Sequence, residues 1–493
     1  MAPASRKGQS PTVKPADGFN LKVQRVGPQA IVVTPAVKAH NWFAGAFTNL
    51  PTDRPVTLRV AMKGHDTRGN RANVAKWQGL WPVMTYADPA NYESYIWFQK
   101  NKSGQWVSGD PFASDEERLA GNGAVPEQFV MPAKLARQCL SPDGKYWSPW
   151  RAIETAEADV RHNVFNIRHR FEAASATVAM RVPYTYTFLQ KFLDRLEEAK
   201  LPGVAIDVAG RTAAGRKLQI IRLDDARSTR PRRERKTILV IAREHATEHA
   251  SSWALHGLLT RLIENSPAAR RLRADTTWLL IPIEDPDGSA DSHFDRLTEQ
   301  FRQSHGPLTA IAPEVFAYTR YFRDYADRGR TLDLAVSLHN VEAREAPNVS
   351  SPFAHHVHRR EIVSFNHELF NRLRTAGYAG GTPQPATNGG SPYRLYGWCA
   401  LHFGTLDIAY EVNDRYPAQR LTLARLQGIG GVLAQQLAAW GKSEPGQRRH
   451  RLARATLQRR QRERTAYLAT AARASGGQAS THRNVFDLIV LGY

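Results

Sequence analysis

Two histidines and two glutamates stand at or beside the ends of apolar segments in this chain. The segment 236–242 is apolar, and His245 and Glu248 follow it at a spacing of three. A turn with that spacing can direct an imidazole and a carboxylate to one point, and these ligands suit zinc. The pattern H-x-x-E alone is weakly specific, because Glu248 could instead cap the helix expected from about Ser251.

Two further apolar segments carry residues of the same chemical kinds. Residues 332–340 carry His339 next to their end, and residues 405–414 carry Glu411 among apolar neighbours. A carboxylate on a buried strand needs a partner or a function, because burial raises its pKa. Glu411 alone could therefore be a paired structural carboxylate. Together, three ligands and an open position make a catalytic zinc site, and a nearby unligated carboxylate can serve as the base.

The elements that would position these residues alternate between strand and helix. Short, apolar, β-branched segments predict buried strands, whereas apolar spacings of three and four predict helices. This alternation predicts an α/β domain over residues 176–442, with a mixed, mostly parallel sheet and helices on both faces. In such sheets, sites lie outside the carboxyl ends of the strands. The predicted strands are 217–223, 236–242, 276–283, 332–338 and 406–412, and the predicted helices include 185–199, 251–265 and 312–329.

Residues 19–175 differ from the rest of the chain in their pattern of polar and apolar residues. Segments of alternating polarity, separated by Pro, Gly, Asn and Asp, predict an all-β sandwich there. Seven tryptophans fall in this region, for which a core or interdomain role is favoured over a sugar-binding platform. Residues 1–18 are expected to form a disordered lead.

The composition places limits on the class of protein. A chain of 493 residues with 42% hydrophobic residues can bury a large core. It contains no apolar run of the roughly 20 residues that a membrane helix needs. The first 20 residues lack the apolar stretch of a signal peptide. Two widely separated cysteines argue against a disulfide framework. These features favour a cytoplasmic protein without a membrane segment.

The net charge of +21 is concentrated in two short runs. Residues 446–464 carry eight arginines against one glutamate, and residues 227–236 carry six basic groups against one glutamate. Such runs attract polyanions, although they are also often only solvated surface. Residues 443–493 are expected to form a basic C-terminal tail that begins as a helix and ends in an apolar run at 484–493.

Several motifs resemble the zinc metallocarboxypeptidase family, which includes carboxypeptidase A and the cytosolic carboxypeptidases. The segment AREHATEHASSW resembles the family's strand, R-x-H-x-x-E and S-S-W pattern, and IPIEDPDG resembles its V-N-P-D-G loop. The resemblance covers residues 176–442 well and extends loosely to the N-terminal region, since a β-sandwich also precedes the catalytic domain of the cytosolic branch. Further matching segments are VPYTYTFLQKFLDRL, GRTAAGRKLQIIRL, GPLTAIAPEVFA and TNGGS.

The resemblance implies a carboxypeptidase-like fold and a zinc-dependent hydrolase that cleaves a peptide bond. His245, Glu248 and His339 would bind one zinc ion per chain. Glu411 would be the general base and then the acid that serves the activated water. Asp287 would orient the imidazole of His245.

The substrate-recognition positions depart from the family pattern. Thr298 and Glu299 stand where the family has an asparagine and an arginine that grip the terminal carboxylate, and Pro385 replaces a tyrosine. Arg296 is the first candidate for the oxyanion-stabilising cation and Arg302 the second. Arg394 could grip a carboxylate, or it could be an ordinary surface arginine.

These departures leave two other functions open. A zinc amidase would act on acylated amino acids or cell-wall peptides with the same chemistry. An inactive polyanion-binding protein would use the two basic runs instead.

Overall fold

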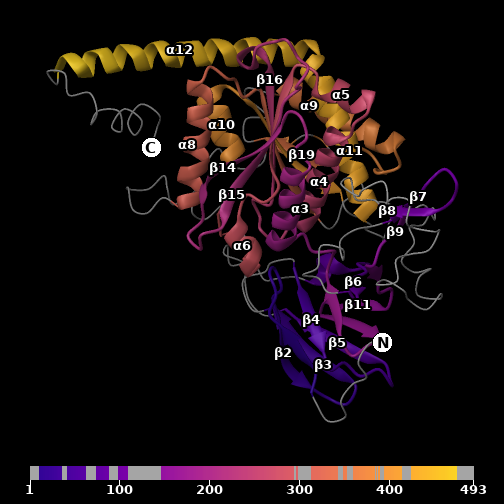
Figure 1. Cartoon of the computed structure of the whole chain (residues 1–493). Coiled ribbons are helices and arrows are strands. Elements are labelled where there is room, and N and C mark those ends of the chain that lie inside the picture. Colours follow the sequence, from indigo (N-terminus) through magenta and orange to yellow (C-terminus); the bar gives the residue numbers. More distant parts are fainter. Residues whose placement is uncertain are drawn as a thin grey trace.

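The structure is a computed structural model of the chain. It describes residues 10–35, 42–62, 74–87, 98–108, 146–293, 296–297, 312–341, 348–351, 359–383, 385, 387–388, 394–413 and 423–474. An all-β region occupies one end of the molecule and an α/β region the other (Figure 1).

The N-terminal region is all-β, as the alternating polarity predicts. Two five-stranded sheets bury a shared core in which Phe43 and Trp77 both contact the ring of Phe165. The order in one sheet is β1 (Thr12–Lys14), β4 (Ala44–Thr48), β13 (Ala176–Ala179), β6 (Val83–Thr85) and β10 (Arg151–Ala152). The order in the other is β11 (Ala156–Asp159), β12 (Val164–His169), β5 (Val56–Ala61), β3 (Ala30–Pro35) and β2 (Leu21–Val26).

Both ends of this region differ from the expected boundaries. Residues 10–18 are not a disordered lead, because β1 pairs with β4 and Asp17 accepts a hydrogen bond from the backbone of Thr187 at 2.7 Å. Strand β13 begins at Ala176 and still belongs to the sandwich. A small additional sheet contains β8 (Trp106–Ser108), β7 (Phe98–Lys100) and β9 (Tyr146–Trp147).

The α/β region is built on one eight-stranded mixed sheet. Its order is β14 (Val204–Arg211), β15 (Lys217–Leu223), β17 (Thr276–Ile281), β16 (Lys236–Ala242), β18 (Leu334–Val341), β21 (Leu406–Asn413), β19 (Asn348–Ser351) and β20 (Thr387–Asn388). The four neighbours β17, β16, β18 and β21 run parallel. The pairs β14–β15, β15–β17 and β19–β21 are antiparallel, so the expectation of a mostly parallel sheet is not confirmed.

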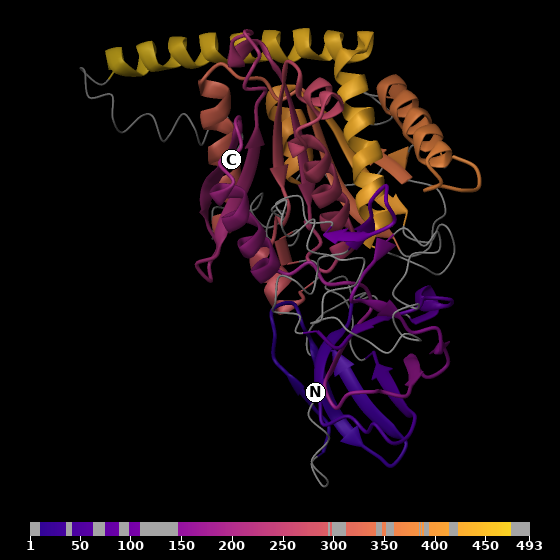
Figure 2. The same cartoon turned by 45° about the vertical axis from the view of Figure 1, so that its right-hand side comes forward.

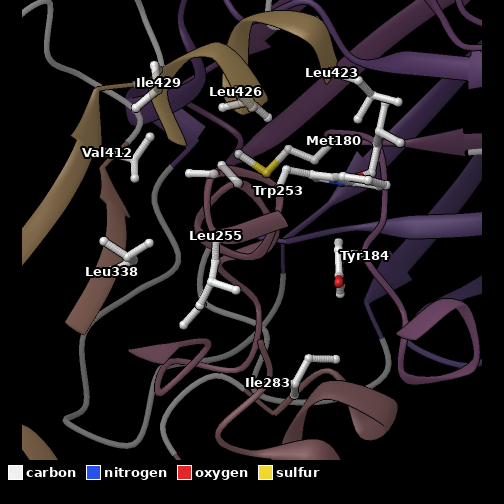
Figure 3. Close-up of a cluster of buried hydrophobic side chains, with 14 of the residues drawn as sticks. Met180, Tyr184, Trp253, Leu255, Ile283, Leu338, Val412, Leu423, Leu426 and Ile429 are labelled. Atoms are coloured by element: carbon white, nitrogen blue, oxygen red, sulfur yellow. The ribbon is translucent and has the colours of Figure 1, made fainter. Parts of the chain in front are cut away.

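Helices cover both faces of the sheet because alternate strand residues point to opposite sides. On one face, side chains such as Leu338 and Val412 pack against α4 (His249–Ile263) and α11 (Leu423–Lys442), as Figure 3 shows. This face also holds α3 (Tyr186–Glu198) and α9 (Arg359–Thr375). On the other face, Ala335 and Ala409 pack with α8 (Pro313–Asp327) and α10 (Leu395–Phe403).

Helices α4 and α11 approach each other closely. A Cβ atom added at Gly257 would overlap the backbone of Gln427, and one at Gly430 would overlap the backbone of Ala254. Glycine at these positions therefore lets the backbones of α4 and α11 come into contact on this face of the sheet. Two short helices, α5 (Pro267–Arg273) and α6 (Pro286–Asp291), lie before and after β17 in the chain.

The basic run at 446–464 lies in the long helix α12 (Glu444–Ala474), which crosses the end of the sheet opposite the sandwich (Figures 1 and 2). His450 Nδ1 lies 2.7 Å from Asp333 Oδ1, and Arg464 pairs with Asp327. Leu457 packs against the core that α8 and α10 share. The described part of the predicted tail, residues 443–474, thus contacts the α/β region. The apolar run 484–493 lies outside the described residues. Among the described helices, none combines the length and apolar character needed to cross a membrane.

Candidate metal centre

A tight turn after β16 carries the first two ligand-type residues. Arg243 adopts a left-handed backbone conformation with φ 63°, and its guanidinium is fully buried. That guanidinium donates hydrogen bonds to the backbone oxygens of Ala246 at 2.6 Å and Tyr184 at 2.8 Å, and to Ser289 Oγ at 3.0 Å. Arg243 therefore holds the turn in place with partners from three segments.

The structure brings His245, Glu248 and His339 together. His245 Nδ1 lies 2.8 Å from Glu248 Oε1, and His339 Nδ1 lies 3.0 Å from Glu248 Oε2. The two Nδ1 atoms are 3.2 Å apart. One ligand atom from each of the three buried residues lies within 4.8 Å of the others.

Glu248 is directed toward the histidines and not toward the helix that it precedes. It occupies the N-cap position of α4, yet its side chain makes no capping hydrogen bond. Burial would raise the pKa of Glu248, but the His245 and His339 imidazoles lower it to about 2. The carboxylate is thus ionised and ready to bind a cation, and the capping alternative does not describe it.

The donor set fits zinc in both chemistry and spacing. Two imidazole nitrogens and a carboxylate, with a fourth position left for water or substrate, are a common catalytic set. Ligands held about 2.0–2.2 Å from a tetrahedral ion lie about 3.3–3.6 Å apart. The observed separations of 2.8–3.2 Å are close to this range. A small shift of each side chain would admit the ion.

Glu411 lies beside this cluster on the neighbouring strand. Strands β18 and β21 are parallel, and His339 and Glu411 are in register. In-register residues of a parallel pair point to the same face, so the carboxylate flanks the imidazole. Glu411 is partly exposed, and its Oε2 atom makes no hydrogen bond within the described part of the protein. Burial raises the pKa of Glu411, while His339 opposes this shift.

The hydrogen bonds found for Asp287 are made to residues other than His245. Its carboxylate accepts hydrogen bonds from Thr212 Oγ1 at 2.7 Å, Arg216 at 2.7 Å and the Ala214 backbone N–H at 3.0 Å. These partners belong to the turn between β14 and β15. The structure therefore does not bring Asp287 to the imidazole that it was expected to orient.

Arg296 is held between two buried carboxylates. It contacts Glu314 at 2.7 Å, and its Nε atom lies 2.9 Å from Asp285 Oδ1. Burial would lower the pKa of Arg296, but Asp285 and Glu314 raise it. The guanidinium is thus engaged in a structural ion-pair network, which gives its predicted oxyanion role no geometric support. The second candidate, Arg302, lies outside the described residues, as do Thr298 and Glu299.

Arg394 is not an ordinary surface residue. It precedes α10, and its Nε atom lies 3.1 Å from Glu244 Oε1. Glu244 Oε2 in turn lies 3.4 Å from His339 Nε2. The structure thus connects Arg394 to the candidate metal centre through a buried carboxylate, and the role of Arg394 in substrate binding stays a prediction.

Sequence reasoning overlooked Arg243 and Glu244. The sequence does contain a signal, because Arg243 and Glu244 stand directly between an apolar strand and His245. Burial of two charged side chains costs free energy, so charged residues at an expected buried position indicate a function. The left-handed conformation of Arg243 carried no signal in the residue type.

The sandwich reaches the segment that carries Glu248. Trp42 stacks on His249, with ring centroids 3.7 Å apart and an interplanar angle of 24°. The Trp42 indole also donates a hydrogen bond to the backbone oxygen of Gly18 at 3.0 Å, and Gly18 bonds to Ala290. The expected interdomain role fits Trp42, which braces the start of α4.

Comparisons with known proteins show which family part of the chain resembles. Residues 189–343 match the family model described as zinc carboxypeptidase, and this range contains His245, Glu248 and His339. The chain is similar to cytosolic carboxypeptidase 6 of Mus musculus, with 30% identity over 106 residues that make up 22% of this chain and 20% of the relative. It is also similar to cytosolic carboxypeptidase 3 of Bos taurus, with 27% identity over 194 residues, or 38% of this chain and 19% of the relative. The chain thus spans about a fifth of the length of these relatives.

Solved structures share the fold over most of the chain. A metallo-carboxypeptidase from Burkholderia cenocepacia superposes with a TM-score of 0.57 at 17% identity, covering 87% of this chain and 99% of the other. A metallo-carboxypeptidase from Pseudomonas aeruginosa, solved with (2-guanidinoethylmercapto)succinic acid, gives 0.58 at 17% identity, covering 86% and 97%. At these identities the likeness concerns the fold. Residues 189–343 are thus similar to the zinc carboxypeptidase family, and the chain shares the fold of the solved metallo-carboxypeptidases.

Proposed function

We propose that this protein hydrolyses an amide bond in a peptide, with zinc held by His245, Glu248 and His339 and with Glu411 as the general base. The observation that carries the proposal is the buried convergence of these three ligands beside Glu411 at the carboxyl ends of β16, β18 and β21. Zinc in such a site polarises a carbonyl and makes a bound water more acidic.

The chain's own residues divide the remaining work. Glu411 has a carboxylate oxygen without a hydrogen bond to the described residues, so it can accept a proton from water and return it to the leaving nitrogen. Glu248 directs its two carboxylate oxygens to the Nδ1 atoms of His245 and His339, which is the placement that a third ligand needs.

Carboxypeptidase specificity is the first choice for the substrate, since the family match supports a peptide with a free C-terminus. A second candidate is an amidase that acts on acylated amino acids or on cell-wall peptides. This alternative is favoured by the ion pairs of Arg296 with Asp285 and Glu314, and of Arg394 with Glu244. Both arginines already have anionic partners, which reduces their capacity to grip a substrate carboxylate.

One experiment separates these substrates. The zinc-loaded protein is incubated with peptides that have either a free or an amidated C-terminus, and with N-acyl amino acids. A carboxypeptidase releases single residues from the free C-terminus only, whereas an amidase also cleaves substrates that lack it. Glu411→Gln is the control for contaminating enzymes. Absence of hydrolysis of every substrate by a protein that contains zinc would contradict the proposal.

We also propose a cytoplasmic location, which is supported by the similarity to relatives named cytosolic carboxypeptidases.

A polyanion-binding surface is proposed on α12. Its exposed arginines fall within an arc of about 80° on the helix surface, at about 100° per residue. These residues, called the arginine stripe below, are Arg448, Arg451, Arg459 and Arg462. The third proposed function, an inactive polyanion-binding protein, is disfavoured because the chain has ligand-type residues at all three metal-binding positions and a carboxylate, Glu411, at the position of the base.

A further inference from the structure

The His339 imidazole presents its two nitrogens to different surroundings. Nδ1 points into the candidate metal centre, 3.0 Å from Glu248 Oε2 and 3.2 Å from His245 Nδ1. Nε2 points away, 3.4 Å from Glu244 Oε2 and 3.2 Å from Ser337 Oγ. A ligand nitrogen must present its lone pair to the metal, so the proton of a neutral ring then resides on the other nitrogen. If His339 bound zinc through Nδ1, its proton would be on Nε2, which faces Glu244.

Glu244 is a buried carboxylate with an anchored position. Its side chain is 1% exposed, and Arg394 Nε lies 3.1 Å from its other oxygen. Burying an ion pair seldom stabilises a fold, because the desolvation of both charges offsets their attraction. A buried Glu–Arg pair next to a metal ligand therefore calls for an explanation other than stability.

We propose that Glu244, held by Arg394, is a positioning residue that fixes the tautomer and ring orientation of His339 for zinc. This inference rests on the proposed function and assigns to Glu244 the kind of role that the sequence suggested for Asp287, but toward the other histidine. An ionised carboxylate is a stronger acceptor than the Ser337 hydroxyl. It also makes the imidazole a more basic ligand. Arg394 acts one step further out, since its Nε atom lies 3.1 Å from the other Glu244 oxygen and so holds the carboxylate in place.

Zinc affinity is the readout, measured on the whole protein by competition with a chelator of known affinity. Loss of such a partner typically weakens metal binding 10–100-fold, so we expect Glu244→Gln to raise the zinc Kd by that factor. Ser337→Ala should change the Kd less. If Ser337→Ala raised the zinc Kd as much as Glu244→Gln or more, Ser337 would be the residue that orients the His339 imidazole, and the proposal would be overturned.

A double variant separates positioning from charge balance. Glu244→Gln leaves Arg394 buried without its anionic partner, which can unfold the protein for a reason unrelated to zinc. Glu244→Gln/Arg394→Gln removes both charges. If Glu244 orients His339, the double variant is folded and still binds zinc 10–100-fold more weakly. Recovery of the parent zinc affinity in the double variant would overturn the proposal, because it would show that Glu244 only neutralises Arg394.

Asp224→Asn is the matched control. Asp224 is likewise a buried carboxylate, 2% exposed, and it pairs with Arg222 at 2.7 Å just after β15. Strand β15 runs antiparallel to β17, so Asp224 lies at the end of the sheet opposite the metal centre. The control should lower the melting temperature and leave the zinc Kd unchanged. A parent protein that binds no zinc would overturn both the proposed function and this inference, whereas equal zinc binding by parent and variants would overturn only the inference.

Discussion

His339 and Glu411 lie opposite each other in register on the parallel strands β18 and β21. This pairing sets a metal ligand and the proposed base on the same face of the sheet without any flexible segment between them. The spacing between adjacent strands is about 4.8 Å, so their relative position is fixed by backbone hydrogen bonds. Under the proposed function, the pairing lets Glu411 serve a water at the metal while another carboxylate, Glu248, would bind the metal itself.

Glu411→Gln should abolish hydrolysis and spare the fold. Glutamine has nearly the same shape but cannot take up a proton, so the rate should fall by about 10²–10⁴-fold. Zinc content and melting temperature should stay at the parent values. The control is Asp407→Asn, the same chemical change four residues earlier on β21, where the carboxylate accepts a hydrogen bond from Ser351 Oγ at 3.0 Å. That control should keep its hydrolytic rate. A Glu411→Gln protein that hydrolyses substrate at the parent rate would remove Glu411 from the mechanism.

Arg296→Met should lower stability more than catalysis. The change leaves Asp285 and Glu314 buried without their cation, and breaking such a network costs about 3–5 kcal/mol. Addition of Glu314→Gln should recover part of the free energy of unfolding, because one buried charge is then removed. If Arg296 instead stabilised an oxyanion, the variant would unfold like the parent and show a kcat about 10²–10³-fold lower.

The arginine stripe on α12 should contribute polyanion affinity and leave hydrolysis unchanged. Asp333, which contacts His450 of α12, precedes His339 by six residues, or about 20 Å along β18 at 3.3 Å per residue. Arg451→Gln/Arg459→Gln/Arg462→Gln should weaken duplex DNA binding and reduce the log–log salt slope by up to about 3. The matched variant carries glutamine at Arg227, Arg230 and Arg233, which are exposed in the second basic run. An equal loss of DNA affinity in both variants would show that the total charge of the protein determines binding, and not the position of the arginine stripe.

This substitution test is sharper than truncation before α12. Removing α12 would expose the core that Leu457 covers and leave Asp333 without His450. A truncated protein would therefore lose stability together with charge, and the two effects could not be separated.

The buried His256 should make stability fall as the pH is lowered. Burial among aromatic rings lowers the pKa of His256 to about 3, whereas the unfolded chain takes up the proton near 6.5. Between these values the unfolded state binds more protons, so the free energy of unfolding decreases by up to about 1.4 kcal/mol per pH unit. The contribution is complete above pH 6.5 and is lost progressively below it. His256→Phe should flatten this dependence between pH 7 and 5 in metal-free denaturation curves, and an unchanged slope would contradict the assignment.

The ligand positions were predictable because they follow from strand periodicity. Apolar runs that end in His339 or precede His245 place these residues at the carboxyl edge of a sheet, whatever the details of packing. The roles of Asp287, Arg296 and Arg394 were not predictable in this way. Their partners, including Thr212, Glu314 and Glu244, come from segments far away in the chain or from a turn whose geometry is set by Arg243 in a left-handed conformation.

Similarly, the alternation of strands and helices predicted the α/β sheet but not its mixed directions. Whether β15 runs with or against β17 depends on the connections, and β14 and β15 are joined as a hairpin through Thr212–Arg216. The docking of α12 was also missed. Two of its inward-facing residues, Arg449 and His450, are polar, and their contacts with Glu361 and Asp333 come from segments far away in the chain.

Zinc content tests the central claim most directly. The parent protein, His245→Asn, His339→Asn and Glu411→Gln are dialysed to equilibrium against the same low free zinc concentration, and zinc per chain is measured by mass spectrometry. We predict about one zinc ion in the parent and in Glu411→Gln, and almost none in the two histidine variants, since each removes one of only three protein ligands. A parent without zinc, or a His339→Asn variant that retains it at the parent level, would contradict the metal centre described above.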